Sequence, residues 1–413
     1  MPSPQSILIL GSVWPEPKSS AAGTRMMQLI EFFQEQGVKV YFACSASNME
    51  FSEDLAALNI SKYSIKLNDS SFDSFLVKLN PTYVLFDRFM TEEQFGWRVA
   101  EHLPEAIRLL DTEDLHCLRF AREQALKANE DFEIQALYNI KAKREIASIL
   151  RCDLTLMISK YEINILKDVF HVDSSLLVYV PFFYSYEQQG FNSFKSYNER
   201  SDFISIGNFF HPPNWDAVRY LKESIWPAIR AKLPSAKLSV FGAYTSPKVE
   251  QLHNPKQGFL IKGRADSALE VIHDSRVMLA PLRFGAGLKG KLFDAMLCST
   301  PSVTSSIGAE GMIVEGQQWP GFIEDEIDQF VDKAVELYAD EPLWNNKSAL
   351  SNSILKANFD KDVHYQTLSS SMDKLKQNLK RHRDRNFLGQ ILHHHTAGAY
   401  KYMSKWIEEK NKK

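Results

Sequence analysis

The sequence predicts an α/β protein of two domains, each built on a parallel sheet. The chain has 413 residues, more than one hydrophobic core usually supports, and 44% of them are hydrophobic. Short apolar runs typical of buried strands alternate with helical stretches along the chain. One aperiodic stretch, residues 184–201, divides this alternation into two halves and is interpreted as an interdomain linker.

The first half, residues 1–183, opens as a strand, a helix and a second strand. An apolar run at 7–10 ends at Gly11, apolar residues at helical spacing occupy 25–36, and the next strand covers 38–43. Further strand runs lie at 83–86, 107–110, 154–158 and 179–182, and a charged helical stretch lies at 120–150. Asp87 and Asp111 each follow a strand run, and open α/β sheets bind ligands at the carboxyl ends of their strands. We therefore expect a ligand site at this edge.

The second half, residues 202–380, repeats the pattern and is followed by a helical tail at 381–413. Its strand runs lie at 203–206, 237–241, 259–261, 277–282 and 301–304, and helical stretches separate them. The tail carries apolar residues that we expect to pack on a domain: Phe387, Ile391, Leu392, Tyr400, Met403 and Trp406. The result is a second parallel α/β domain with a helix behind it.

Charge and cysteine usage exclude several classes of protein. The net charge of -3 gives no basic surface for nucleic acid, and the four cysteines form no Cys-x-x-Cys pair. The chain starts without the order of a signal peptide, and no apolar run approaches the roughly 18 residues of a membrane span. These features predict a cytoplasmic protein whose membrane contact is at most peripheral, at the inner face.

The most informative motif joins a strand, a glycine loop and a helix at residues 277–297. Its glycines are Gly285, Gly287 and Gly290. Free amide groups at the helix start favour a phosphate, and Lys289 and Lys291 add two cations to the same turn. Asp294 lies on the same helical face as Lys291 and can accept hydroxyl hydrogen bonds. Together these groups suit a sugar nucleotide.

Several motifs in both halves resemble the group 1 (family 4-like) retaining glycosyltransferases, which have the GT-B fold. They lie at 110–119, 205–214, 280–296, 301–312 and 386–411. The resemblance implies two Rossmann-like domains facing a cleft, the first on the acceptor side and the second binding the nucleotide sugar, with a C-terminal helix packed on a domain. It also implies transfer of a hexose-type sugar, with retention, to the hydroxyl of a glycan, lipid-linked or small-molecule acceptor. Synthesis of a bacterial surface glycan is the expected setting.

The resemblance also assigns site residues. The implied catalytic residues are His116, Lys289 and Lys291. The implied substrate-binding residues are Gly11, Gly23, Arg25, Asp111, Asp114, Arg119, Gly207, Asn208, Arg264, Gly285, Gly287, Leu288, Gly290, Leu292 and Asp294. The lysines are expected to neutralise the departing diphosphate, and His116 to orient the acceptor or the reacting sugar. The competing structural interpretations are solvent-facing lysines, a packed histidine and helix caps by Asp111 or Asp114.

One departure from the family pattern affects the donor site. Many members carry two glutamates eight positions apart around this helix start, whereas Ala286 and Asp294 occupy the matching positions here. Asp294 is then expected to bind ribose hydroxyls. No Asp-x-Asp element follows a strand, and the adjacent histidines 393–395 point in different directions on a helix. We therefore expect neither a metal nor a cofactor besides the donor substrate.

Three alternatives stay open at the level of sequence. A GT-B sugar-nucleotide epimerase or an inverting transferase shares the same nucleotide-binding features. A catalytically silent protein that binds a nucleotide sugar is also compatible with Ala286. The motifs do not choose among UDP, GDP and dTDP donors, and they do not identify the acceptor.

Overall fold

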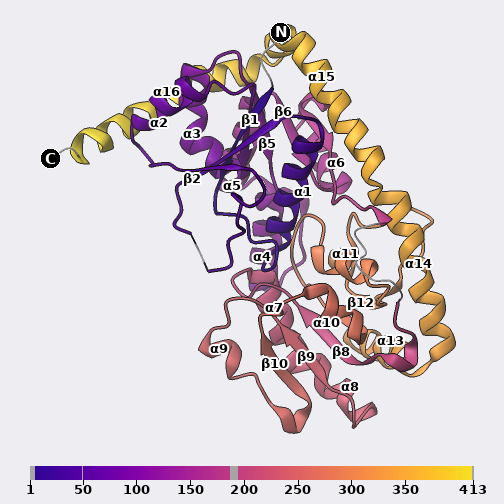
Figure 1. The fold of residues 1–413 in the computed structure, drawn as a ribbon. Coiled ribbons are helices and arrows are strands. Elements are labelled where there is room, and N and C mark those ends of the chain that lie inside the picture. Colours follow the sequence, from indigo (N-terminus) through magenta and orange to yellow (C-terminus); the bar gives the residue numbers. More distant parts are fainter. Residues whose placement is uncertain (1–4, 49, 187–193, 412–413) are drawn as a thin grey trace.

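The structure is a computed structural model that describes residues 5–48, 50–186 and 194–411. It consists of two sheets of parallel strands flanked by helices, one in each half of the chain (Figure 1). The predicted α/β class and the pair of Rossmann-like domains are confirmed. In the described parts of the chain, the helices are too short or too polar to cross a membrane.

The first sheet has seven parallel strands in the order β3-β2-β1-β4-β5-β6-β7. Its strands are β1 (Ser6–Gly11), β2 (Lys39–Cys44), β3 (Ser61–Ser64), β4 (Tyr83–Asp87), β5 (Ile107–Asp111), β6 (Leu154–Met157) and β7 (Leu177–Tyr179). Asp87 of β4 lies opposite Asp111 of β5, so the ends of these strands are level. β3 was not predicted because it is a short polar strand at the edge of the sheet.

Apolar clusters on both faces of this sheet form the core of the first domain. The covering helices are α1 (Ala21–Glu35), α2 (Ser71–Leu79), α3 (Arg88–His102), α4 (His116–Ala128), α5 (Ile140–Arg151) and α6 (Lys160–Asp168). The expected helical stretch at 120–150 is broken in two. Helix α4 ends at Asn129, which adopts a left-handed conformation with φ 56°, and a short turn at Ile134–Leu137 precedes α5.

The second sheet has six parallel strands in the order β10-β9-β8-β11-β12-β13. They are β8 (Ser201–Ile206), β9 (Leu238–Phe241), β10 (Phe259–Gly263), β11 (Ser275–Ala280), β12 (Ser302–Thr304) and β13 (Gly321–Ile323). The helices are α7 (Pro212–Tyr220), α8 (Trp226–Lys232), α9 (Pro247–Glu250), α10 (Ala268–Asp274), α11 (Gly290–Leu297), α12 (Ser306–Ala309), α13 (Ile327–Ala339) and α14 (Glu341–Phe359). The three-residue strand β13 was missed because it is too short to carry a pattern.

Two long C-terminal helices, α15 (Lys361–Arg385) and α16 (Phe387–Asn411), return to the first domain (Figure 1). Tyr365 and Leu368 of α15 belong to the core of the first domain, and α16 packs against α3 and α5. Residues 361–380, expected in the second domain, therefore pack on the first. The chain crosses between domains twice, and the crossings pair through the Tyr184 amide and the Phe359 carbonyl at 2.7 Å. Residues 187–193 of the predicted linker lie outside the described residues.

Candidate functional site

A cleft with a volume of about 690 Å³ lies between the two domains. The loops after β1, β4 and β5 form its first-domain wall. Its second-domain wall consists of the loops after β8 and β9 together with the glycine loop and the start of α11. These loops leave the carboxyl ends of their strands, where the sequence predicted a ligand site.

The glycine loop delivers the start of α11 to the cleft. Gly287 adopts a left-handed conformation with φ 64°, and Lys289 is the N-cap residue of α11, without a capping hydrogen bond from its side chain. The Lys289 ammonium donates hydrogen bonds to the carbonyls of Ala286 at 3.2 Å and Gly287 at 2.6 Å. The loop thus places a cation and the positive end of a helix dipole at one point of the cleft.

Lys291 lies in the first turn of α11 and lines the cleft beside the loop that follows β8. Its ammonium donates to Asn214 Oδ1 at 2.8 Å, and the Asn214 amide donates to the Asn208 carbonyl at 2.9 Å. A Cβ atom at Gly207 would lie 2.8 Å from the Lys291 ammonium, so a larger residue here would displace the end of the lysine side chain. The structure therefore brings together Gly207, Asn208 and Lys291, which the sequence assigned to one site.

Burial shifts the pKa values of the charged groups on this wall. Burial lowers the pKa of Lys289 to about 8, and burial together with the neighbouring Lys289 charge lowers that of Lys291 to about 7. Burial also raises the pKa of Asp294 to about 7. Both lysines therefore lose their protons close to neutral pH. An anion bound beside them would favour their charged forms and would bind favourably.

His116 begins α4 on the opposite wall. The Glu145 carboxylate accepts the backbone N–H groups of His116 and Cys117 at 3.0 Å each, which caps this helix start. The His116 ring nitrogen Nδ1 lies 3.3 Å from the Asp114 carbonyl, and Asp114 forms an ion pair with Arg119. His116, Asp114 and Arg119 all line the cleft, as expected. Their roles in binding or catalysis stay predictions.

Five of the assigned residues do not line the cleft. Arg25 and Asp111 form an ion pair at 2.7 Å beneath the cleft floor, with exposed side-chain fractions of 1% and 0%. Arg25 also donates to the Val180 carbonyl at 2.6 Å. Gly11 packs against Phe42, Leu292 is fully buried in the core, and Gly287 contacts Asp114 across the domain interface. Their contacts are structural rather than directed at a ligand.

The remaining assigned residues lie around the cleft as expected. Those that line it are Gly23, Arg264, Gly285, Leu288, Gly290 and Asp294. Arg264 pairs with Asp266 at 2.8 Å, and its guanidinium lies 4.7 Å from the Phe51 ring of the first domain. A Cβ atom at Gly290 would lie 2.5 Å from Ala21 of the first domain, so this glycine permits close contact between the domains.

Sequence reasoning missed the polar groups that join the two domains. Glu162 Oε1 accepts the Leu115 N–H at 3.0 Å and the Gly287 N–H at 2.7 Å, so one carboxylate holds α4 and the glycine loop. Arg122 donates to the Gly285 carbonyl at 2.9 Å and pairs with Glu310. Partners more than a hundred residues apart leave no local pattern, so no signal in a single sequence identifies them.

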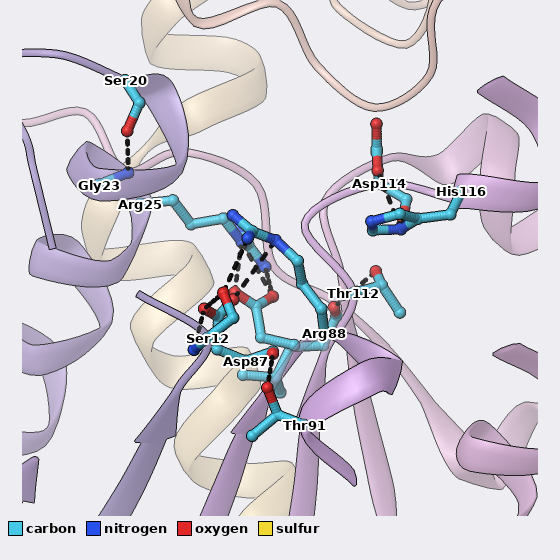
Figure 2. Close-up of polar contacts among 12 residues, drawn as sticks. Ser12, Ser20, Gly23, Arg25, Asp87, Arg88, Thr91, Thr112, Asp114 and His116 are labelled. Atoms are coloured by element: carbon cyan, nitrogen blue, oxygen red, sulfur yellow. Dashed lines mark hydrogen bonds and ion pairs between the residues drawn. The ribbon is translucent and has the colours of Figure 1, made fainter. Parts of the chain in front are cut away.

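Sequence reasoning also missed a polar cluster at the ends of β1 and β4. Ser12 donates through its N–H at 2.9 Å and its hydroxyl at 2.6 Å to Asp87 Oδ2, and Arg88 donates to the Ser12 hydroxyl at 2.8 Å. Figure 2 shows these three side chains meeting beside the Arg25 pair and below Asp114 and His116. The position of Asp87 after a strand was the available signal.

Comparison with known proteins places the second half of the chain in a family. Residues 200–340 match the family model described as "Glycosyl transferases group 1". An uncharacterized 44.6 kDa protein in the cps region of Klebsiella pneumoniae is 29% identical over 115 residues, covering 26% of this chain. The chain spans only about 30% of the length of that curated relative.

Solved structures of several glycosyltransferases share the whole fold. Sucrose-phosphate synthase from Thermosynechococcus elongatus has a TM-score of 0.65 and 14% identity, over 90% of this chain and 99% of that chain. S. aureus TarM, in a complex with UDP and alpha-GlcNAc-glycerol, has a TM-score of 0.69 and 9% identity over 89% and 99%. HepE from Anabaena, in complex with UDP and glucose, has a TM-score of 0.64 and 12% identity over 90% and 100%.

Two Rossmann-like domains on either side of a cleft define the GT-B class of glycosyltransferases, and the structural neighbours share this arrangement. The family match then narrows the class. Residues 200–340 are similar to the group 1 glycosyl transferases, and the whole fold is similar to GT-B glycosyltransferases, so the resemblance inferred from the sequence is confirmed in these two respects.

Proposed function

We propose that the protein transfers a hexose-type sugar from a nucleoside diphosphate sugar to an acceptor hydroxyl, with retention of the anomeric configuration. The two cations at the start of α11 are the observation that carries this proposal. Lys289 and Lys291 face the cleft from the glycine loop and the first helical turn, and burial holds both pKa values below the ordinary lysine value. A diphosphate is the ligand that would compensate them.

The lysines also explain how the leaving group would be stabilised. Negative charge on the diphosphate grows as the glycosidic bond breaks, so cations fixed in the cleft bind the transition state more tightly than the ground state. Asp294, on the same helix, would accept hydrogen bonds from ribose hydroxyls. With this counter-charge supplied by protein, the proposal requires no divalent ion, and turnover that persists in excess EDTA would support that point.

The known proteins support this assignment in outline. Two structural neighbours bind UDP, one together with glucose and one together with alpha-GlcNAc-glycerol. The relative from the cps region favours a role in bacterial surface polysaccharide synthesis. The reaction would then take place in the cytoplasm or at the inner face of the membrane, on a glycan, lipid-linked or small-molecule acceptor.

The first experiment measures nucleotide binding and nucleotide release together. We expect a UDP, GDP or dTDP sugar to raise the melting temperature of the wild type. We also expect the enzyme to release the nucleotide slowly from that sugar. Both effects should be lost in Lys289→Ala/Lys291→Ala. The matched control is Lys237→Ala/Lys256→Ala, two exposed lysines that precede β9 and β10 at the opposite edge of the sheet. Binding without release would identify a silent protein, and no response to any nucleotide would refute the proposal.

An inverting transferase is the second candidate, because the cleft contains a group able to accept a proton. His116 lines the first-domain wall, opposite the lysines. An inverting reaction uses such a group as general base, whereas the retaining reaction does not require one. Proton NMR of the first product formed decides between them: an anomer matching the donor supports retention, and the opposite anomer supports inversion.

A further inference from the structure

Ser12, Asp87, Arg88 and Glu113 form a group, here called the strand-end cluster, that the donor site does not use. The four residues follow β1, β4 and β5, which are neighbours in the first sheet. Asp87, Arg88 and Glu113 line the cleft, on the wall opposite Lys289 and Lys291. The cluster therefore faces the side of the cleft where a second substrate would lie.

The backbone at this cluster is strained in two places. Arg88 has φ 69° and Glu113 has φ 62°, both in the left-handed region that disfavours residues other than glycine, asparagine and aspartate. Each such residue is energetically unfavourable and persists only where the surrounding structure imposes it. The strain turns two charged side chains into the cleft immediately after adjacent strands. Such strain is common at ligand sites.

The cluster also contains a buried acceptor atom without a hydrogen bond. Asp87 is 4% exposed, and its Oδ2 atom takes both hydrogen bonds from Ser12 (Figure 2). Its Oδ1 atom has no hydrogen-bond partner among the residues that the structure describes, and the Arg88 guanidinium lies 3.7 Å from it. Unpaired buried oxygens are rare in proteins, so this atom indicates a donor group supplied by a ligand.

Charge at the strand-end cluster and directly beside it is balanced by ion pairs. The pairs are Asp87 with Arg88, Asp111 with Arg25 and Asp114 with Arg119. Burial and the nearby Asp111 charge raise the pKa of Glu113 to about 8, which keeps this carboxyl protonated at neutral pH. A phosphate or carboxylate brought to the cluster would meet no uncompensated positive charge and would face Asp87.

We propose that the strand-end cluster is the acceptor subsite and takes a neutral sugar through a pair of neighbouring hydroxyl groups. A hydroxyl both donates and accepts, so one can donate to Asp87 Oδ1 while its neighbour accepts from Arg88. Glu113 adds a hydrogen bond to the same sugar. This inference rests on the proposed function, since it names the class of acceptor for that reaction.

The test is a ligand-observed NMR titration of the full chain with two sets of probes. The neutral set is the methyl glycosides of glucose, galactose and mannose, and the acidic set is methyl glucuronide and glycerol phosphate. Arg88→Gly and Glu113→Gly remove the side chains and fit the left-handed backbone. Glu113→Gly should keep the melting temperature of the wild type, whereas Arg88→Gly also removes the charge partner of Asp87 and should lower it, so circular dichroism first confirms that this variant is folded. Glu113→Gln is the conservative control, because its amide also donates and accepts.

We expect at least one neutral glycoside to bind and both acidic probes to bind at least tenfold more weakly. Arg88→Gly and Glu113→Gly should weaken neutral binding at least fivefold, while Glu113→Gln stays within threefold of the wild type. Preference for an acidic probe, unchanged binding in both glycine variants, or no neutral binding at millimolar concentration would each overturn the proposal. Lys289→Ala/Lys291→Ala should lose nucleotide binding and keep glycoside binding. A wild type that binds glycosides without nucleotides would therefore contradict the proposed function and not the acceptor subsite.

Discussion

The two walls of the cleft are built in different ways. On the second-domain wall, the glycine loop, Lys289, Lys291 and Asp294 lie within one strand, loop and helix, so their spacing in sequence fixes their spacing in space. The first-domain wall collects single residues from the separate loops after β1, β4 and β5. A motif therefore predicts the second-domain wall, whereas the sheet topology alone assembles the first-domain wall.

This difference also separates residues that face the cleft from residues that hold the walls in place. Arg25 and Asp111 satisfied the strand-end rule and were assigned to substrate, yet they pair with each other in the interior. Lys289 and Lys291 instead face the cleft, and burial lowers their pKa values in the absence of a carboxylate partner on the same motif. The predictions below test this division.

The largest expected effect is loss of stability on breaking the buried ion pair. Arg25→Ala leaves Asp111 as an uncompensated charge, and removal of one partner from a buried pair costs about 3–5 kcal/mol. We expect urea denaturation followed by circular dichroism to show this loss. Arg219→Ala is the control, because its i,i+4 pair with Glu223 is exposed and contributes under about 1 kcal/mol.

Retained stability in Arg25→Ala, together with lost transfer activity, would contradict the structural role. It would return Arg25 to the substrate-binding residues assigned from the sequence. Arg25→Ala is expected to lose stability and transfer activity together. Nucleotide binding should then recover when the variant is stabilised by low temperature and added osmolyte, as a structural role requires.

A smaller effect is expected at the carboxyl that joins the two walls. Glu162→Ala removes the acceptor of the Leu115 and Gly287 N–H groups, and two lost hydrogen bonds cost about 2 kcal/mol. Because Gly287 belongs to the glycine loop, nucleotide affinity should fall with stability. Thermal denaturation with and without UDP measures both quantities.

Glu162→Gln is the matched control for this position. Burial and the Asp114 charge raise the pKa of Glu162 to about 8, so the neutral carboxyl predominates at pH 7 and glutamine preserves its acceptor oxygen. We expect this variant to remain within about 0.5 kcal/mol of the wild type. An equal loss of stability in both variants would show that the contact of Glu162 with the Leu115 and Gly287 N–H groups depends on negative charge.

The sequence predicts local elements well and contacts between distant residues poorly. Strand runs such as 7–10 and 83–86 lack charged residues, so their positions were predicted to within a residue or two. The contact of Glu162 with Gly287 joins residues 125 positions apart, and nothing in either segment marks it. Helix α15 was assigned to the second domain up to residue 380, whereas its buried residues belong to the core of the first. Periodicity gives the buried face of a helix without naming its partner.

A pH dependence of nucleotide binding tests the second-domain wall most directly. The pKa values of Lys289 and Lys291 are lowered to about 8 and about 7, so the free protein loses these protons as the pH rises through that range. A diphosphate binds the charged lysines and raises both pKa values, so binding takes up protons. Affinity is therefore greatest below about pH 7 and falls above it, about tenfold per pH unit for each linked proton.

Calorimetric titration with UDP in buffers of different ionisation enthalpy measures this proton uptake. UDP completes its own ionisation at about pH 6 to 7, so it contributes little to the change at higher pH. Lys289→Arg/Lys291→Arg is the control, because arginine keeps its charge throughout this range and should flatten the profile. A wild-type affinity that stays constant between about pH 7 and pH 9 would mean that neither lysine changes protonation on binding, and the donor wall would then recognise the diphosphate through the amide groups of α11.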